Sequence, residues 1–435
     1  MASAQYNQAS RPQKWDLRSC IEYALDQNIT IRQNKLSAES SRIDVDNAKA
    51  DYLPNISGSI SQRIVNRPWS ENSVQINGDI ISTAQSKTSY SGNYGVDVSW
   101  ALFRGNRVHN IKQQKVNSEI ADINVTQSEN SIIESIVQSY VSILYATDAI
   151  AVSDSTLSTS IKNYERGKTL FDVGSMSKAD LAQLESQVSQ DRYNLVVAQT
   201  NLANYKLQLK QLLELDGEME MDLFLPEVSD EAVLALLPSR TDVYNAALQT
   251  RPEIEAAKLN IEASDLAIKA AKSGYLPTVS VSAGIGTSNM NGTDFTFSEQ
   301  VKRNWNNSLG LSVSIPIFDK KSTKNSIRKA KIQRQEQEIS LQDQEKNLYK
   351  TIESLWLDAN SAQQQYLSAK DRVKSNETSL ELVQQQFEVG MKNTIELLTE
   401  TNNLLSARQE MLQAKYMALM NTQLLKYYAG EGINI

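Results

Sequence analysis

The stretch "AKADYLPNIS" at Ala48–Ser57 recurs almost unchanged as "AKSGYLPTVS" at Ala271–Ser280. The shared Ala-Lys-x-x-Tyr-Leu-Pro motif has an offset of 223 residues, about half of the 435-residue chain. Proline has no backbone N–H and pushes the residue before it out of the α region. A charged, helix-like run precedes each motif and an alternating run follows it. We therefore predict a helix-to-strand junction at each motif, formed by Tyr52, Pro54, Tyr275 and Pro277.

Two further matches follow the first one at nearly the same offset. "YGVDVSWALF" (94–103) matches "LGLSVSIPIF" (309–318), and "FDVGSMSKADL" (171–181) matches "FEVGMKNTIEL" (387–397). An internal repeat sets the architecture of a chain. We predict two copies of one unit, each made of a helix, two strands and a long helical hairpin. The predicted domains are a first repeat at 15–213, a linker at 214–240 and a second repeat at 241–430.

The runs after each motif alternate with period two, which indicates strands with one apolar and one polar face. Val96, Val98 and Trp100, for example, alternate with Asp97 and Ser99. Strands of about 9 to 11 residues cross a bilayer when tilted, and these runs are of that length. A small soluble sheet with one face on a core is the alternative. The polar faces carry Ser, Asn and Gly rather than Lys and Glu, which favours a membrane β-barrel.

Four strands cannot close a barrel, and lipid does not tolerate open sheet edges. The barrel must then be shared between chains. Three chains would supply twelve strands and four chains would supply sixteen, and both numbers are even as in bacterial barrels.

The segments 104–171 and 319–387 contain no proline, and their only glycines are Gly105 and Gly167. About 68 helical residues would extend for about 100 Å, which is too long for a single globular core. A soluble antiparallel coiled-coil stalk would account for such helices but not for the strands. Together they predict a helical barrel that continues the strand barrel. Apolar residues recur every seven positions, as in coiled coils, at Leu181, Val188, Leu195, Leu202 and Leu209 and at Leu397, Leu404, Met411, Ala418 and Leu425.

The composition excludes several classes of protein. A net charge of −7 gives no basic footprint for nucleic acid. Cys20 is the only cysteine and His109 the only histidine, so we expect neither a disulfide framework nor a metal site. We read Cys20 as a core residue. No phosphate-binding loop or nucleophile motif is present, so we expect no enzyme activity and no cofactor.

The chain has no run of about 18 apolar residues, so the sequence predicts no transmembrane helix. Its first residues, "MASAQYNQASRPQKW", lack the charged and apolar regions of a signal peptide. These residues leave two possibilities open. The protein is either cytoplasmic, or its signal peptide has been removed from this sequence.

The order of elements resembles the TolC family of outer-membrane efflux proteins over residues 15–428. The likeness rests on the opening "WDLRSCIEYALDQN" (15–28), the doubled Tyr-Leu-Pro and the two Phe-[Asp/Glu]-Val-Gly turns. It implies an α+β membrane protein that forms a homotrimer. A twelve-stranded β-barrel, with four strands per chain, would contact the lipid of a Gram-negative outer membrane. A long α-helical barrel would continue it through the periplasm, and a signal peptide would have been removed.

The resemblance also implies a passive exit duct of a tripartite efflux or type I secretion system, for drugs, metabolites or proteins. The partners would be a periplasmic adaptor and an inner-membrane pump of RND or ABC type. The alternative is a periplasmic or soluble coiled-coil adaptor or scaffold protein. An adaptor would carry compact β domains beside one hairpin, whereas this chain has two separated pairs of strands.

The turns at Gly174 and Gly390 join long helices, and we predict that both glycines are left-handed C-terminal caps. By resemblance the turns form the periplasmic tip, where the family carries acids at the sixth and ninth positions after the second glycine. These positions hold Glu396 and Thr399 here, which implies a single acidic ring; a pair between Lys392 and Asp180 of a neighbouring helix pair would hold the tip closed. Asp180 and Glu396 could instead be first-turn acids favoured by the helix dipole. The candidate gate residues are Glu396, Asp180, Lys392 and Thr399, and the candidate adaptor contacts are Phe171, Val173, Gly174, Phe387, Val389 and Gly390.

Overall fold

The computed structural model describes residues 14–69, 73–76, 79–82 and 87–433. The chain divides into two compact units. The sheet unit contains residues 39–119 and 259–338, and the helical unit contains the rest of the described chain. Each unit takes a part of both sequence copies. The compact units and the repeats are thus two different divisions of the same chain.

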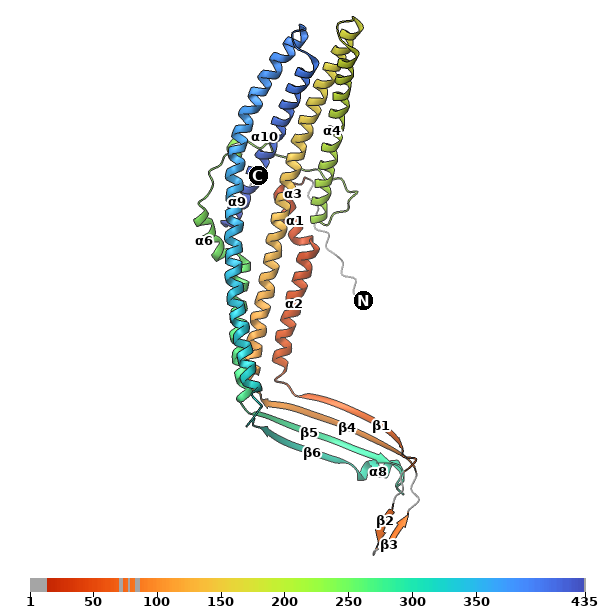
Figure 1. Ribbon diagram of the computed structural model, residues 1–435. Coiled ribbons are helices and arrows are strands. Elements are labelled where there is room, and N and C mark those ends of the chain that lie inside the picture. The colour runs from red at the N-terminus through yellow and green to blue at the C-terminus, as the bar shows by residue number, and fades with distance from the viewer. Residues whose placement is uncertain (1–13, 70–72, 77–78, 83–86, 434–435) are drawn as a thin grey trace. The chain divides into compact units, whose positions relative to one another are not determined.

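The sheet unit contains the four predicted strands. They are β1 (Asn55–Asn66), β4 (Thr88–Phe103), β5 (Thr278–Met290) and β6 (Asn306–Ser314). They pair antiparallel in the order β1-β4-β5-β6, so β1 and β6 are the edge strands (Figure 1). One boundary differs from the sequence prediction. β6 ends at Ser314, before Pro316, which cannot donate a ladder hydrogen bond, so Ile315 and Ile317 lie outside the strand.

Three short elements of the sheet unit were not predicted. A hairpin of β2 (Ser73–Ile76) and β3 (Asp79–Ser82) lies between β1 and β4. The helix α8 (Phe297–Arg303) lies between β5 and β6, and a 3-10 turn (Ser273–Tyr275) precedes β5. The connections between strands at the end of the sheet away from the long helices are therefore partly ordered.

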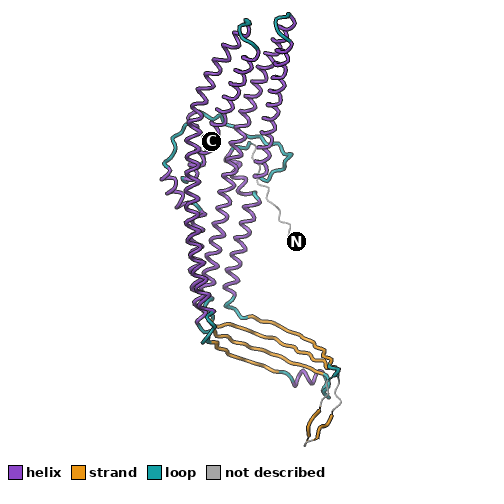
Figure 2. Tube along the Cα trace, in the orientation of Figure 1, coloured by secondary structure: helices purple, strands orange, loops and turns teal. Residues whose placement is uncertain are grey.

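The long helices agree with the sequence prediction. α3 (Arg107–Asp172) has 66 residues and α9 (Ser322–Glu388) has 67 residues. At 1.5 Å per residue each is about 100 Å long. α4 (Lys178–Leu212) and α10 (Thr394–Tyr428) follow them after tight turns (Figure 2).

The helix before each Tyr-Leu-Pro motif is broken in two, which corrects the prediction of one helix of about 30 residues. In the first copy α1 (Leu17–Gln27) and α2 (Ile29–Ala50) meet at Asn28. In the second copy α6 (Arg240–Thr250) and α7 (Pro252–Lys272) meet at Arg251. The difference between 251 and 28 is again 223, so the break belongs to the repeated unit.

Buried polar side chains hold both breaks. Asn28 accepts the N–H of Thr30 at 2.9 Å and donates to the carbonyl of Leu212 at 3.0 Å. Arg251 is 6% exposed and donates to Glu134 at 2.8 Å. Its guanidinium carbon also lies 3.5 Å from the ring centroid of Tyr428, a cation–π contact. The repeated break is thus stabilised by different chemistry in the two copies.

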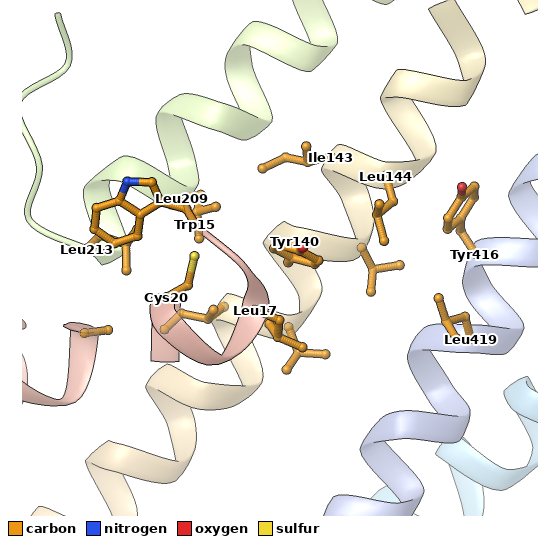
Figure 3. Close-up of a cluster of buried hydrophobic side chains, with 14 of the residues drawn as sticks. Trp15, Leu17, Cys20, Tyr140, Ile143, Leu144, Leu209, Leu213, Tyr416 and Leu419 are labelled. Atoms are coloured by element: carbon orange, nitrogen blue, oxygen red, sulfur yellow. The ribbon is translucent and has the colours of Figure 1, made fainter. Parts of the chain in front are cut away.

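The core of the helical unit collects apolar side chains from α1, α3, α4 and α10 (Figure 3). Cys20 lies in this core with no exposed surface, which confirms its predicted role. Burial raises the pKa of its thiol to about 12. Because thiolates are the reactive form of cysteine, this thiol is inert at neutral pH.

One described helix is long and apolar enough to span a membrane by length and composition, which corrects the sequence expectation. It is α3, which has an 18-residue window with a mean hydropathy of 1.3. Ile136, Tyr140 and Ile143 of this helix are fully buried in the core of the helical unit. Packing therefore accounts for much of its apolar character.

The linker between the copies contains α5 (Asp230–Val233) and lies against α9. Gln363 of α9 donates to the carbonyls of Val233 and Ala235 at 2.9 Å each. The hydroxyl of Tyr366 donates to Asp230 at 2.5 Å. These bonds fix the linker on the outside of one long helix.

Candidate functional site

Both hairpin turns end their first helix in the same way. Gly174 and Gly390 each have φ of +77°, the left-handed conformation that glycine adopts without strain. Ser175 donates its N–H to the carbonyl of Leu170 at 2.8 Å, and Met391 donates to that of Gln386 at 2.8 Å. These six-residue bonds close Schellman motifs. The predicted C-terminal caps are confirmed.

The second helix of each hairpin begins with a side-chain cap. Ser177 accepts the N–H of Asp180 at 3.1 Å, and Asn393 accepts the N–H of Glu396 at 2.9 Å. The Glu396 carboxylate accepts the N–H of Asn393 at 3.0 Å, which completes a capping box. Both acids therefore occupy the first helical turn, where the helix dipole favours negative charge. Their role at a gate stays a prediction.

Lys392 lies against Glu396 in the same turn, with 2.5 Å between Nζ and Oε1. Asp180 instead accepts the hydroxyl proton of Ser177 at 2.6 Å. The predicted Lys392–Asp180 pair is thus not formed within one chain. Lys392 and the N–H of Asn393 hold the pKa of Glu396 below its ordinary value. Glu396 therefore stays ionised to lower pH than a free glutamate would.

The two turns enclose a groove of about 480 Å³ within the helical unit. Met176, Ser177 and Asp180 line one side, and Val389, Lys392 and Asn393 line the other. The apolar tips are open to solvent: Val173 is 70% exposed, Val389 70% and Met391 75%. These side chains give the tips an apolar, partly charged surface.

Phe171, Phe387 and Thr399 differ from one another in surroundings. Phe171 is 37% exposed, whereas Phe387 is 6% exposed and packs in a core with Leu397 and Val373. Phe387 is thus corrected from a contact residue to a core residue, because the α9–α10 hairpin closes over it. Thr399 is exposed, and its hydroxyl donates to the carbonyl of Ile395 at 2.8 Å.

Close helix packing near the first turn depends on Gly167. A Cβ at this position would lie 2.4 Å from Cδ1 of Leu184, which is 1% exposed. We predict that Gly167→Val destabilises the α3–α4 hairpin by about 1 to 3 kcal/mol through overpacking. Limited proteolysis at the turn measures this loss. Gly217→Val is the matched control, since its Cβ would meet nothing closer than 3.7 Å; equal protease resistance of the Gly167 variant and wild type would contradict the packing argument.

The sheet carries one apolar face that nothing in its own unit covers. On the edge strands Ile56 is 66% exposed, Ile60 79% and Leu309 82%. Registers place the side chains of Ile56, Val98, Ala283 and Leu309 in one row across the four strands. Monomeric soluble proteins rarely expose so continuous an apolar surface. The opposite face carries mostly Ser, Asn and Gly, as predicted.

The first helix-to-strand junction is held by Arg107, which the sequence analysis did not single out. Its side chain is 3% exposed and donates to Asp51 at 2.9 Å and to the carbonyl of Ala101 at 2.9 Å. The guanidinium lies 4.5 Å from the ring centroid of Tyr52, and the indole of Trp100 donates to the carbonyl of Tyr52 at 2.8 Å. Pro54 lies directly before β1.

The second junction uses small residues instead. Pro277 lies directly before β5, and Tyr275 ends the 3-10 turn. A Cβ on Gly274 would lie 3.0 Å from the side chain of Thr323, so the two segments are in close contact. Gly274 occupies the position equivalent to Asp51, and it has no side chain to take part in an ion pair. The two copies therefore have different junctions.

Comparison with solved structures shows which class of protein has this arrangement. The chain superimposes on the crystal structure of CusC with a TM-score of 0.78 and 20% identity, over 99% of this chain and 96% of that one. At this identity the likeness shows the fold alone. It is the fold of channels in the outer membrane, with long helical hairpins attached to a four-stranded sheet.

Sequence comparison then gives the family. The family model described as outer membrane efflux protein matches residues 20–214 and 243–431. Outer membrane protein TolC of Escherichia coli K12 is 22% identical over 349 residues, covering 77% of this chain and 68% of that protein. Cation efflux system protein CusC of the same strain is 23% identical over 417 residues, covering 93% and 84%. The chain belongs to the outer membrane efflux protein family.

Family membership confirms three predictions from the sequence: the TolC-family resemblance, an efflux channel as the function, and the outer membrane of Gram-negative bacteria as the location. The two matched segments fall on the two sequence copies. Among the described residues, no group of three or more His, Cys, Asp or Glu side chains could hold a metal ion.

Proposed function

We propose that three copies of this chain close a twelve-stranded β-barrel in the outer membrane, continued by a helical barrel in the periplasm. The assembly is a passive exit duct. It receives substrates from an inner-membrane pump of RND or ABC type through a periplasmic adaptor. The chain itself carries out no catalysis.

The observation that carries this proposal is a sheet with an exposed apolar face and two unpaired edges. Lipid accepts such a sheet only when its edges are closed. Among the described strands β1 pairs only with β4, and β6 pairs only with β5. Pairing of β1 with β6 of the next copy would close the barrel, and the family resemblance supports three copies.

The helices next to the edge strands support the same assembly. α2 leads into β1 and exposes apolar residues every seven positions: Ile29 is 50% exposed, Leu36 66% and Ile43 56%. α9 follows β6 and exposes Ile332 at 56% and Ile339 at 66%, also seven residues apart. Seven-residue apolar seams are typical of helices that pack against other helices. A soluble scaffold would leave both seams and the apolar sheet face in water.

Single-particle imaging of the detergent-extracted protein tests the proposal. We expect threefold particles with a detergent belt at one end and a stalk of about 100 Å, from the helix rise. Monomeric rods without a belt would reject the exit duct and favour the coiled-coil scaffold.

We predict that Leu36→Glu prevents trimer formation, because it places a charge in each of three helix seams at a cost of about 2 to 4 kcal/mol per site. Native mass spectrometry measures the oligomer. Ser37→Glu, one residue further on the same exposed helix, is the control and should remain trimeric. A trimeric Leu36 variant would exclude this seam from the interface.

We propose that the tips contact the adaptor. The exposed side chains of Val173, Val389 and Met391 border the groove that contains Lys392 and Asp180. A helical hairpin with an apolar stripe and flanking charges would match this surface. Phe171 is available to such a partner, whereas Phe387 supports the turn from inside.

We predict that Glu396→Gln lowers the cation selectivity of single channels, by roughly twofold or more if three carboxylates converge on a narrow axis. Lys392→Gln should raise it, because Lys392 partly neutralises Glu396 at 2.5 Å. Reversal potentials in planar bilayers under a salt gradient measure both effects. Glu381→Gln removes the same charge from an exposed position on α9 and is the control. Unchanged reversal potentials in both variants would remove this pair from the gate.

A further inference from the structure

The short helix α8 lies against the end of the sheet remote from the long helices (Figure 1). The hydroxyl of Thr287 on β5 donates to the carbonyl of Val301 at 2.8 Å. The rings of Tyr94 on β4 and Phe297 meet edge to face, with 6.1 Å between their centroids. Gln300 is buried and accepts the N–H of Met290 at 2.8 Å. The helix is therefore docked on the sheet and is not a loose loop.

Strand registers show which face of the sheet α8 covers. Tyr94 is paired with Ile60 on β1 and with Thr287 on β5, so the three side chains share a face. Successive side chains alternate between faces. Val96 and Val98 therefore project on the same side as Tyr94. The helix lies on the apolar face, the one that meets lipid in the proposed barrel.

The apolar band of this face ends where α8 begins. Along β5 the residues facing this side are Val279, Val281, Ala283 and Ile285, followed by Thr287 and Asn289. On β1 Gln62 follows Ile60 and donates to the hydroxyl of Tyr94 at 2.5 Å. From Leu102 to Tyr94 the band extends about 26 Å along β4, at about 3.3 Å per residue. Transmembrane barrels have an apolar band about 25 Å tall, bordered by aromatic residues.

The exposed residues around α8 combine aromatic rings with cations. Phe297 and Trp305 are each 57% exposed. Lys302 and Arg303 are exposed, and neither forms an ion pair with any residue that the structure describes. The guanidinium of Arg303 lies 3.9 Å from the ring centroid of Phe295. Aromatic and basic side chains in this combination are typical of helices at a membrane–water interface.

The acidic side chains nearby leave the cations available. Glu299 is engaged in the capping box with Thr296, at the other end of α8. Asp294 lies before the helix and forms no ion pair among the described residues. The helix dipole favours Lys302 and Arg303 at the C-terminal end whether or not a ligand is present. The dipole does not explain why exposed aromatic rings accompany them at the edge of the apolar band.

We propose that α8 is a binding site for a phosphorylated glycolipid of the outer leaflet, with Lys302 and Arg303 contacting its phosphates and Phe297 and Trp305 lying among its acyl chains. The inference rests on the proposed function, because it requires the apolar face to meet lipid. The helix then fixes the depth of the barrel in the membrane at its outer surface.

The test uses the full-length protein in detergent and bisphosphorylated lipid A as the probe. We expect Lys302→Gln/Arg303→Gln to weaken lipid A binding by about fivefold for each cation lost, from the typical contribution of a basic residue at an anionic membrane surface. Native mass spectrometry across a lipid titration measures it. Lys320→Gln/Lys321→Gln is the matched control, since these exposed lysines lie at the other end of β6 and should leave the affinity unchanged.

Further arms separate the possible outcomes. Lipid A without its phosphates should bind the wild type as weakly as the double variant binds lipid A. Equal affinity of the double variant and wild type would overturn the site, and so would equal wild-type binding of phosphatidylglycerol and lipid A. Channel formation by both variants in planar bilayers is measured in parallel. Loss of channels from the wild type itself would instead count against the proposed function.

Discussion

Replacing Leu309 by arginine should abolish assembly in the outer membrane, whereas replacing the adjacent Ser308 should not. Leu309 is 82% exposed in the middle row of the apolar face, and Ser308 projects from the polar face. An arginine at the bilayer midplane costs about 2 to 4 kcal/mol for each chain. The same residue on the polar face would meet water inside the barrel, near Asp97. Outer-membrane fractions, assayed for trimer by electrophoresis without heating, measure the difference.

The two substitutions introduce the same side chain at neighbouring positions on one strand. They differ only in the face on which it projects. Normal assembly of the Leu309 variant would mean that this face does not meet lipid. Failure of both variants would mean that β6 cannot accept an arginine at all, and Leu309→Ala would then distinguish a requirement for size from a requirement for apolarity.

Glu134→Gln should lower the stability of the helical unit by about 2 to 3 kcal/mol, because it leaves the buried charge of Arg251 without a counter-charge. The Arg251 side chain is 6% exposed and that of Glu134 is 26% exposed. The ring of Tyr428 compensates part of the loss through its cation–π contact. The thermal unfolding midpoint, followed by circular dichroism in detergent, should fall accordingly.

Glu22→Gln is the control for this prediction. It breaks the Arg18–Glu22 pair, whose side chains are 87% and 65% exposed. Exposed pairs of this kind contribute about 0 to 1 kcal/mol. Similar midpoints for the two variants would show that Arg251 does not depend on its acid. Arg251→Met together with Glu134→Leu should be milder than Glu134→Gln alone, since it removes both charges.

The repeated Tyr-Leu-Pro motif located the strands because proline and period-two alternation act over a few residues. The same local signals define the glycine caps at Gly174 and Gly390. The helix breaks at Asn28 and Arg251 were missed. A signal for the second was present, because Pro252 is favoured at the first position of a helix. The first depends on a bond from Asn28 to Leu212, which lies 184 residues away in the chain.

Site chemistry was harder to predict than the fold. The pair of Lys392 and Glu396 has the i, i+4 spacing of a helix, so the sequence contained that signal. The burial of Phe387 depends on how α9 and α10 pack together, which no local pattern records. α8 begins with the sequence Thr-Phe-Ser-Glu, a capping-box pattern that announces a helix start. Its position on the apolar face could not be read from that pattern.

The different junctions of the two copies have a mechanical consequence. In the first copy Arg107 ties Asp51 and Ala101 together, so bending there would require breaking charged hydrogen bonds. In the second copy Gly274 and Thr323 are only in van der Waals contact, which resists compression but not shear. A ring built from three such chains would alternate stiff and compliant joints. Its softest deformation would therefore have threefold rather than sixfold symmetry, with the second copies flexing between fixed first copies.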